Sequence, residues 1–192
     1  MYRFSEFMCA LFLLICLAPV LLTVALLIYL TMGRPILFRQ QRPGLNANPF
    51  IIYKFRTMTL STKSAIDELG ETARITSLGK WLRRLSLDEL PQLFNILKGD
   101  LGFIGPRPLL MEHLALYNPE QSRRHLVKPG VTGWAQVNGR NSISWEDKLK
   151  LDVWYVDNKS WLLNMKILFM TVLVVLGSKG IEYHAHTSGF KK

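Results

Sequence analysis

Cysteine and histidine are scarce in this 192-residue sequence. The two cysteines, Cys9 and Cys16, both lie in an N-terminal apolar run, and the chain has no Cys-x-x-Cys pair. On a helix, residues seven apart are separated by about 10 Å, which is too far for a disulfide bond. Of the four histidines, only His184 and His186 are close in sequence, and we expect both to be exposed near the polar C-terminus. The sequence therefore predicts neither a disulfide nor a zinc site.

Acidic residues are few relative to basic ones. The chain has 14 Asp and Glu against 24 Lys and Arg, a formal net charge of +10, in a length that suits one compact domain. Such an excess attracts anions, whether nucleic acid, phospholipid headgroups or phosphorylated substrates. Nucleic acid is the least favoured of these, because the basic residues do not cluster with stacking aromatics or on a recognisable reader helix. We expect no specific binding of nucleic acid.

Charge of either sign is absent from residues 7–32, FMCALFLLICLAPVLLTVALLIYLTM. As a helix, these 26 residues are long enough to cross a hydrocarbon layer of about 30 Å. The run is longer than the apolar core of a signal peptide, and no small-x-small cleavage site follows it. We therefore expect residues 1–33 to form a retained membrane helix and residues 34–192 to form a membrane-associated domain that carries the chemistry.

Pro19 lies at the middle of this apolar run, where it removes a backbone hydrogen bond and predicts a sharp kink. Positive charge flanks both ends of the run, with Arg3 before it and Arg34 after it, so the charges do not set an orientation. Two arrangements stay open on these residues. One is a re-entrant helix with both ends on the cytoplasmic side, and the other is a kinked helix that spans the membrane once.

The rest of the chain is typical of a domain that lies on the membrane surface. Residues 34–60 hold several basic residues, no acid and turn signals around strand-like runs, which predicts a small β-hairpin. Residues 61–73 are polar with mixed charge, as in an exposed loop or a short surface helix.

Helical periodicity dominates after the hairpin. Apolar spacing from residue 77 onward predicts two helical pieces that meet near Asp88. The apolar segment 161–177 contains an Asn and a Lys, which suits an interfacial helix better than a second span, and the same surface could support a homodimer. The expected fold class is mostly α with a small β-hairpin, in a monotopic membrane protein.

Two adjacent carboxylates, Asp88 and Glu89, stand in the stretch LSLDELPQLFNILKGDLGFIGPRP (residues 85–108). A structural explanation exists, because Ser86 and Glu89 have the spacing of a capping box at a helix N-terminus. The stretch then continues into GFIGPRP, where glycine and proline hold the backbone around Arg107. An arginine in a rigid frame suits phosphate binding through its planar guanidinium, although such a turn on its own is more often structural.

The segment KPGVTGWAQVNGRN (residues 128–141) is rich in Gly, Asn and Gln and carries one Trp. We expect a loop that offers hydrogen-bond donors and a stacking face, which suits a nucleotide or a sugar. Connecting loops of this composition are common, so the segment is informative only together with the other motifs.

The sequence resembles the bacterial sugar transferase family, the monotopic phosphoglycosyl transferases. The resemblance rests on KFRTM, SLDELPQLFNILKGDLGFIGPRPLL and KPGVTGWAQVNGRN behind an N-terminal apolar helix, and it covers about residues 4–177. Within the family, the chain is most similar to minimal members such as the undecaprenyl-phosphate N,N'-diacetylbacillosamine 1-phosphate transferases of protein glycosylation. It departs from the family at the bend, where Ala18-Pro19 replaces the common Ser-Pro.

The resemblance implies that a UDP-sugar gives its phospho-sugar to undecaprenyl phosphate, leaving UMP and an undecaprenyl-diphosphate sugar. The family's nucleophilic aspartate maps to Asp88, which would form a covalent phospho-sugar intermediate, and the adjacent glutamate maps to Glu89. The resemblance also implies Mg²⁺ as cofactor and a place in the bacterial inner membrane. There the catalytic domain would face the cytoplasm, contact inner-leaflet phospholipids and perform the first membrane step of glycoconjugate biosynthesis.

A carboxylate that attacks a diphosphate approaches another anion, so the site must supply positive charge. We expect Mg²⁺ bound by Asp88 and Glu89 to supply part of it, and a helix N-terminus beneath Asp88 to keep that carboxylate ionised. The candidates for substrate binding are Arg107, Lys54, Arg56 and Arg84 for the phosphates, and Pro106, Pro108, Gln136 and Asn138 for the uridine and phosphate pocket. Asp152 is a further candidate acid, and a surface helix charge explains it equally well.

Two other functions stay open on the sequence. One is a one-step transferase, in which Asp88 is a base or metal ligand and donor and acceptor react in a ternary complex. The other is a non-catalytic membrane anchor or assembly protein, which leaves the Asp-Glu pair without a role. The sugar is open as well, because the resemblance suggests diacetylbacillosamine while N-acetylgalactosamine, galactose and glucose are alternatives.

Overall fold

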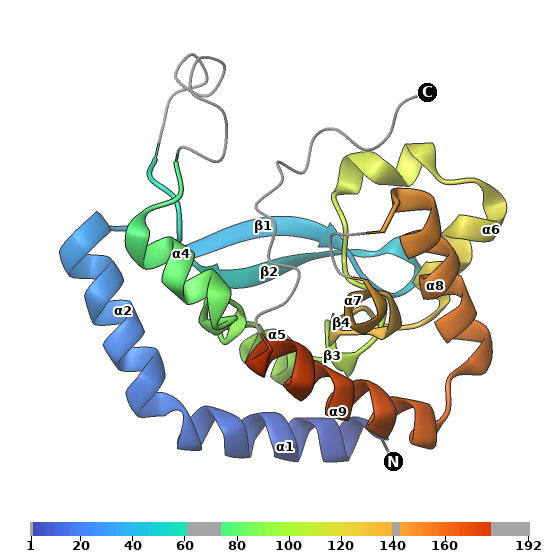
Figure 1. Cartoon of the computed structure of the whole chain (residues 1–192), viewed down its shortest axis with the longest axis horizontal. Helices are drawn as coiled ribbons and strands as arrows, with labels where there is room; N and C mark the ends of the chain where they lie inside the picture. Colours follow the sequence, from blue (N-terminus) through green and yellow to red (C-terminus); the bar gives the residue numbers. More distant parts are fainter. Residues whose placement is uncertain (1, 61–73, 140–142, 178–192) are drawn as a thin grey trace.

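The computed structural model of the chain describes residues 2–60, 74–139 and 143–177 (Figure 1). The expected loop at 61–73 and the two histidines near the C-terminus lie outside these residues. In the described parts, the fold is mostly helical with two small sheets, as the sequence predicts in the main.

The elements follow one another in this order. The α-helices are α1 (Tyr2–Cys16), α2 (Ala18–Met32), α4 (Ser77–Arg84), α5 (Gln92–Lys98), α6 (Pro119–Ser122), α7 (Trp134–Asn138), α8 (Trp145–Asn158) and α9 (Trp161–Leu176). The strands are β1 (Leu37–Pro43), β2 (Pro49–Phe55), β3 (Gly102–Ile104) and β4 (Gly130–Thr132). Short 3₁₀ turns are η1 (Leu45–Ala47), η2 (Leu87–Glu89), η3 (Met111–Leu116) and η4 (Arg123–Leu126).

The N-terminal apolar run is bent, which confirms the predicted kink. Helices α1 and α2 meet at Leu17 at an angle of 61°, and Pro19 lies in the first turn of α2, where its missing N–H costs least. In the described part of the chain, no single helix has both the length and the hydropathy of a membrane span, whereas α1 and α2 have them together. The bent pair is compatible with a broken span and with a re-entrant loop.

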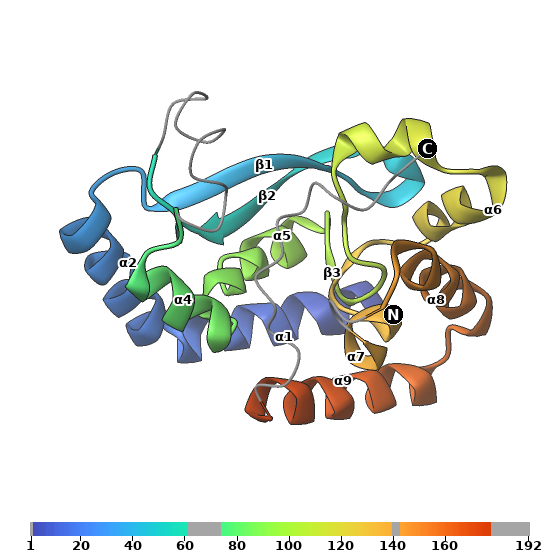
Figure 2. The ribbon, with the colours of Figure 1, turned by 45° about the horizontal axis from the view of Figure 1, so that its top comes forward.

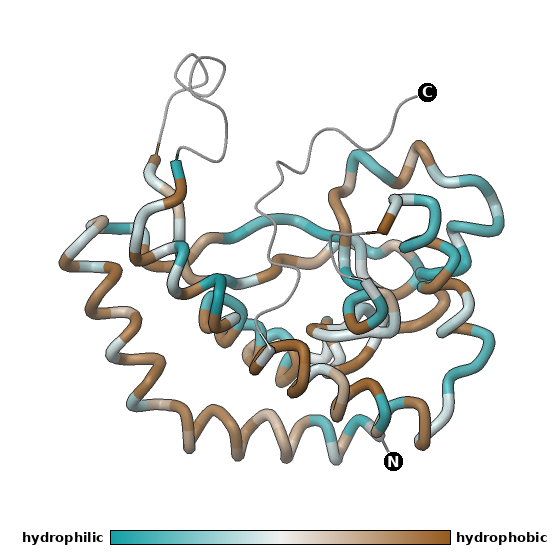
Figure 3. The backbone as a smooth tube through the Cα atoms, in the orientation of Figure 1, coloured by the Kyte–Doolittle hydropathy of each residue, from teal (hydrophilic) through white to brown (hydrophobic). Residues whose placement is uncertain are grey.

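Apolar side chains are exposed along three helices. Both α1 and α9 lie on one side of the molecule, with α2 continuing from α1 (Figure 2), and all three are apolar along most of their length (Figure 3). The most exposed of these side chains are Phe4, Phe12, Ile15, Leu22, Leu30, Leu162, Phe169 and Leu176. A surface of this kind is costly in water and suits contact with lipid.

The predicted hairpin is present, and one of its faces contributes side chains to the site described below. Strands β1 and β2 are antiparallel, with Leu37 opposite Phe55 and Pro43 opposite Pro49. Helix α5 is fixed to its edge by the buried Asn95, whose Oδ1 accepts from the Tyr53 backbone N–H at 3.1 Å and whose Nδ2 donates to the Ile51 carbonyl at 2.6 Å.

Helix α1 packs on this unit rather than standing apart from it. Ala10 of α1 is fully buried in one cluster with Phe50 and Ile52 of the hairpin and with Leu93 and Ile96 of α5. The N-terminal helix therefore shares a hydrophobic core with the elements that hold the Asp-Glu pair.

The segment expected as a loop at 128–141 is partly regular. Residues Gly130–Thr132 form β4, which runs parallel to β3, and Trp134–Asn138 form α7. The parallel pairing requires a close backbone approach, because a Cβ at Gly130 would lie 2.1 Å from the backbone nitrogen of Gly105. The glycines of this motif thus allow close packing of the backbone. The composition of the motif alone does not distinguish this role from ligand binding.

Candidate active site

The two adjacent carboxylates lie on η2, in the short connection between α4 and α5. The chain turns there through Ser86, whose backbone is left-handed at φ 55°. The predicted capping box is wrong, because the Ser86 side chain makes no cap hydrogen bond and the Glu89 side chain points to other partners. Glu89 is therefore not explained by helix capping.

Glu89 is held by two cations from distant parts of the chain. Its Oε1 accepts from Lys54 Nζ at 2.6 Å and from Arg107 Nη2 at 2.7 Å. Lys54 comes from β2 and Arg107 from the GPRP turn after β3. The structure thus brings together four of the expected site residues, Asp88, Glu89, Lys54 and Arg107.

The two carboxylates have opposite electrostatic environments. Burial opposes the ionisation of Glu89, yet Arg107 and Lys54 lower the pKa of its carboxyl below the usual range. Burial, and then the charge of Glu89, raise the pKa of Asp88 to about 6, against the opposing effect of Lys54, Arg83 and Arg107. The expectation that a helix N-terminus keeps Asp88 ionised is therefore wrong: Asp88 lies on a 3₁₀ turn, and α5 begins only at Gln92.

A cavity opens beside this cluster. Lys54 and Arg107 line it together with Arg42 of β1, and His113 and Trp145 line it as well. The rings of His113 and Trp145 meet edge to face with their centroids 5.4 Å apart. The stacking face expected in the 128–141 segment is instead used internally, because Trp134 stacks on Trp154 at 5.1 Å.

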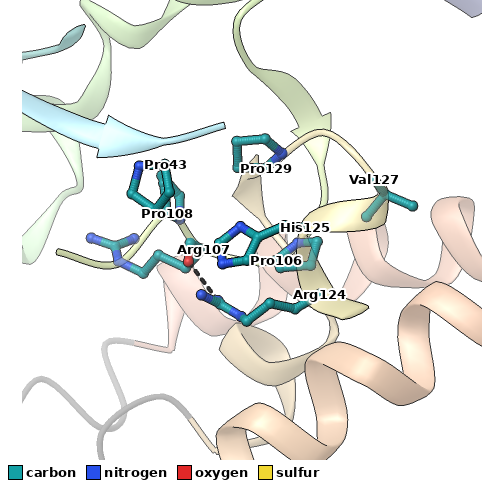
Figure 4. Close-up of a pocket in the computed structure, with 8 residues that line it drawn as sticks. All are labelled: Pro43, Pro106, Arg107, Pro108, Arg124, His125, Val127 and Pro129. Carbon is teal, nitrogen blue, oxygen red and sulfur yellow. Dashed lines mark hydrogen bonds between the residues drawn. The ribbon is translucent and has the colours of Figure 1, made fainter. Parts of the chain in front are cut away.

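Prolines and residues of η4 pack against the turn that carries Arg107 (Figure 4). Pro106 and Pro108 lie against Pro43 and His125 there, and Arg124 Nη2 donates to the Arg107 carbonyl at 2.7 Å. The backbone of Arg107 is therefore fixed while its side chain reaches Glu89.

Asp152 is not a surface helix charge, because it is only 4% exposed. Its expected role as a further acid of the site stays a prediction, and in the structure its partner is a buried arginine. Its Oδ2 accepts from Arg124 Nη2 at 2.6 Å and from Arg124 Nε at 3.1 Å. Asp152 orients the arginine that holds the Arg107 carbonyl, so it acts on the site through Arg124.

Two expected phosphate-binding arginines lie elsewhere. Arg56 is buried and its Nη2 donates to the carbonyls of Met32 and Gly33, which closes the C-terminal end of α2. Arg84 is exposed, whereas its neighbour Arg83 is the arginine whose charge acts on Asp88. Successive residues of a helix point about 100° apart, which places the two side chains in different surroundings.

Gln136 and Asn138 are also placed away from the cavity. Neither lines it. The exposed Asn138 donates from Nδ2 to the Trp134 carbonyl at 2.8 Å, and Gln136 packs beside Gly133. The folding of this segment into α7 turns both side chains to local contacts.

Two further arginines near the site, Arg42 and Arg83, were not predicted from the sequence. For Arg42 a signal exists, because alternate residues of an antiparallel pair share a face: Arg42, Ile52 and Lys54 all line the cavity. For Arg83 there is no such signal. Its Nε donates to Thr57 Oγ1 at 2.9 Å, a contact between segments 26 residues apart.

The acidic pair suits a magnesium ion. The described residues contain no group of three or more Asp, Glu, His or Cys side chains that could enclose a metal. Mg²⁺ is, however, commonly bound through one or two carboxylates, with substrate phosphates and water completing its shell. Both ion pairs of Glu89 use Oε1, so they leave Oε2 and the Asp88 carboxylate for such an ion.

Comparison with known proteins gives consistent matches. The sequence pattern of the family described as "Bacterial sugar transferase" matches residues 1–178. An uncharacterized sugar transferase of Bacillus subtilis (strain 168), EpsL, is 53% identical over 186 residues, which cover 97% of this chain and 92% of EpsL.

Two relatives of named activity are longer proteins. The undecaprenyl-phosphate galactose phosphotransferase of Salmonella typhimurium is 35% identical over 93% of this chain and 41% of its own length. The UDP-glucose:undecaprenyl-phosphate glucose-1-phosphate transferase of Klebsiella pneumoniae is 37% identical over 88% of this chain and 39% of its own length. The chain thus spans about two-fifths of the length of these two relatives.

Proposed function

Because this chain belongs to the bacterial sugar transferase family, we propose that it is an undecaprenyl-phosphate sugar-1-phosphate transferase. Its donor is a UDP-sugar, its acceptor is undecaprenyl phosphate, and its products are UMP and an undecaprenyl-diphosphate sugar. The names of the Salmonella and Klebsiella relatives support this acceptor, and the latter supports a UDP-sugar donor.

One observation carries the proposal: the two adjacent carboxylates are in different states. Glu89 is neutralised by Lys54 and Arg107, while Asp88 makes no ion pair in the described parts of the chain and has a pKa raised to about 6. A carboxylate that burial makes more basic, yet that is still mostly ionised at pH 7, is suited to act as a nucleophile.

The first step is attack on the donor. An oxygen of the Asp88 carboxylate forms a bond to the phosphorus that carries the sugar, the bond from that phosphorus to the bridging oxygen breaks, and UMP leaves with the electron pair. Lys54 and Arg107 lie where they can stabilise the charge that develops on the phosphate oxygens. The intermediate is an acyl phospho-sugar on Asp88.

The second step regenerates the enzyme. A phosphate oxygen of the lipid attacks the same phosphorus, and the Asp88 carboxylate leaves, so that the phospho-sugar passes to the lipid. The acceptor keeps its tail in the bilayer, and the exposed apolar surface of α1, α2 and α9 supports a position of the domain at headgroup depth. The location proposed is the cytoplasmic face of the bacterial inner membrane, among inner-leaflet phospholipids.

Mg²⁺ is the proposed cofactor, with Asp88 and Glu89 as the residues that hold it. When bound, the ion neutralises charge on phosphate oxygens. Removal of divalent ions with EDTA should abolish UMP release, and added Mg²⁺ should restore it; full activity in EDTA would contradict this assignment.

The sugar is the least determined part of the proposal. The names of the relatives support glucose and galactose as candidates beside diacetylbacillosamine and N-acetylgalactosamine. One substrate panel tests all four, because the sugar that discharges UMP is the one the pocket accepts.

The test is UMP release from UDP-glucose, UDP-galactose, UDP-N-acetylgalactosamine and UDP-diacetylbacillosamine, with and without undecaprenyl phosphate, by wild type and Asp88→Asn. Intact-mass measurement should find a phospho-sugar adduct on the wild type alone, formed without lipid and discharged by it. Strictly lipid-dependent release with no adduct would instead favour the one-step reaction. If no UMP is released from any donor, the protein is instead a membrane anchor or an assembly protein.

A further inference from the structure

Arg42 lines the same cavity as the cations that bind Glu89. It lies on β1, on the face of the hairpin that also carries Ile52 and Lys54, and Arg107 lines the same cavity. Arg42, Lys54 and Arg107 therefore place three positive charges around one opening. The proposed chemistry above uses only two of them.

Arg42 differs from the other two cations in having no carboxylate partner among the described residues. Lys54 and Arg107 both bind Glu89, whereas Arg42 donates from Nη2 to the neutral Gln40 Oε1 at 2.6 Å and from Nη1 to the Pro108 carbonyl at a long 3.5 Å. Its buried Nε has no hydrogen-bond partner within the described parts of the chain. Burial, and then the charge of Arg107, lower the pKa of Arg42 to about 10.

A guanidinium in this condition is costly to the fold, since a partly buried cation without a counter-ion loses hydration and gains little in return. An anion that enters the cavity would remove the cost, and a planar guanidinium prefers oxygens that accept two parallel hydrogen bonds, as phosphate does. The three cations that line the cavity can therefore bind an anion in addition to the Asp-Glu pair.

The position of Arg42 indicates which phosphate it would bind. Arg107 binds Glu89, the neighbour of Asp88, and the next residue of the same turn, Pro108, accepts from Arg42 Nη1 at a long 3.5 Å. The turn that carries Arg107 therefore connects the acidic pair to Arg42, and both arginines line one cavity. A diphosphate whose sugar-bearing phosphorus is at Asp88 would extend past Arg107 towards Arg42.

We propose that Arg42 binds the phosphate of the leaving nucleotide, so that the UMP half of the donor, and not the lipid acceptor, depends on it. This inference rests on the proposed function for the identity of the nucleotide. It predicts a selective defect: Arg42→Gln should weaken UMP binding and raise the KM for the UDP-sugar by about tenfold to a hundredfold, the range for a charge-assisted hydrogen bond. The KM for undecaprenyl phosphate should not change.

Arg39 provides the matched control. It lies on the same strand three residues earlier, on the opposite face, where it is exposed and its guanidinium lies 5.7 Å from the Tyr53 ring centroid. Arg39→Gln removes the same charge from the same strand, so it corrects for any general effect of net charge. It should leave UMP affinity and both KM values at the wild-type level.

The experiment is calorimetric titration of UMP into full-length protein in detergent, for wild type, Arg42→Gln, Arg42→Lys and Arg39→Gln, followed by the two KM values. Arg42→Lys keeps the charge without the planar fork, so its UMP affinity should fall between wild type and Arg42→Gln. A melting temperature for each variant shows that the titrated protein is folded.

Three outcomes overturn the inference. These are unchanged UMP affinity in Arg42→Gln, an equal loss of affinity for UMP and for undecaprenyl phosphate, and an equal loss in Arg39→Gln. The proposed function fails separately, if wild type releases no UMP from any donor. The titration of UMP still tests Arg42 as a phosphate-binding residue in that case, because it needs no turnover.

Discussion

Two carboxylates of this protein are each paired with arginine, and the two pairs differ in what surrounds them. Asp152 and Arg124 are both buried, and Arg124 also donates to the Arg107 carbonyl and to the Tyr117 hydroxyl. Glu89 lies beside the cavity that Lys54 and Arg107 line, shares one oxygen between these two cations and stands next to a second carboxylate. The first pair is enclosed by the protein, whereas the cations that bind Glu89 also line a cavity that a ligand can enter.

The two pairs are connected through one residue. Arg107 gives its carbonyl to the Asp152–Arg124 pair and its guanidinium to Glu89. The buried pair therefore holds the backbone from which the site arginine extends. A rigid backbone with an adaptable charged end is an arrangement suited to catalysis, because the donor groups are in position before the substrate arrives.

Asp88→Asn should have the largest effect on activity. It removes the nucleophile, so UMP release should fall by at least about a thousandfold. Burial raises the pKa of Asp88 to about 6, so the ionised carboxylate is less favourable in the folded protein than in the unfolded one. This cost to the stability of the fold is fully present above about pH 6. The neutral Asn should therefore not lower the melting temperature at pH 7. A lowered melting temperature together with retained UMP release would assign Asp88 to the fold.

Asp152→Asn should have the largest effect on stability. It leaves the buried Arg124 without its counter-ion, which typically costs about 3–5 kcal/mol in the free energy of unfolding. The double variant Asp152→Leu with Arg124→Met should recover most of that loss, since an apolar pair of similar volume needs no counter-charge. Denaturant unfolding in detergent measures both changes.

Activity should not recover in the double variant, because the Arg107 carbonyl would have no donor there. UMP release by the double variant is therefore the discriminating measurement. Wild-type turnover in a stable double variant would show that the buried pair does not position Arg107.

Acid should slow the first step through Asp88. The attacking form is the carboxylate, so adduct formation should fall by about tenfold for each pH unit below about 6. A bound cation favours the ionised form, so a higher Mg²⁺ concentration should move the midpoint to lower pH. Stopped-time intact-mass measurements from pH 4.5 to 8 at two Mg²⁺ concentrations test both points. A profile without an acidic limb would argue against a carboxylate nucleophile with this pKa.

Arg123→Gln should have the smallest effect. Arg123 pairs with Glu120 and Asp157 at the surface, only one position from the buried Arg124. Exposed ion pairs are screened by water and salt and contribute little to stability. The melting temperature and UMP release should both match wild type. A loss comparable to that of Asp152→Asn would mean that burial is not what separates the two kinds of pair.

Local patterns predicted much of the fold. The kink near Pro19, the hairpin within residues 34–60, the two helices on either side of Asp88 and the apolar helix near the C-terminus are all present. Each depends on neighbours in the sequence, through hydrophobic period, a proline or turn residues. The capping box of Ser86 failed for the same reason, because a spacing rule takes no account of the distant cations that compete for Glu89.

The site was predicted in part. Asp88, Glu89, Lys54 and Arg107 lie together and Pro108 lines the adjoining cavity, whereas Arg56, Arg84, Gln136, Asn138 and Asp152 have their contacts elsewhere or are exposed. Composition identifies a side chain that can bind phosphate, but the direction in which it points follows from packing. Arg83 and Arg84 show this most directly, since they are adjacent and chemically identical, yet Arg83 binds Thr57 and its charge acts on Asp88, while Arg84 is exposed.

The sequence by itself determined the apolar N-terminal run, the elements with short-range periods and the presence of an acidic pair beside a rigid arginine turn. Only the tertiary structure decided the partners, because the decisive contacts join residues 35 apart for Lys54 and Glu89, 18 apart for Arg107 and Glu89, and 28 apart for Arg124 and Asp152. Pairing over such separations is set by how helices and strands pack against each other. Local propensity therefore specifies the elements, and their packing specifies which charges meet.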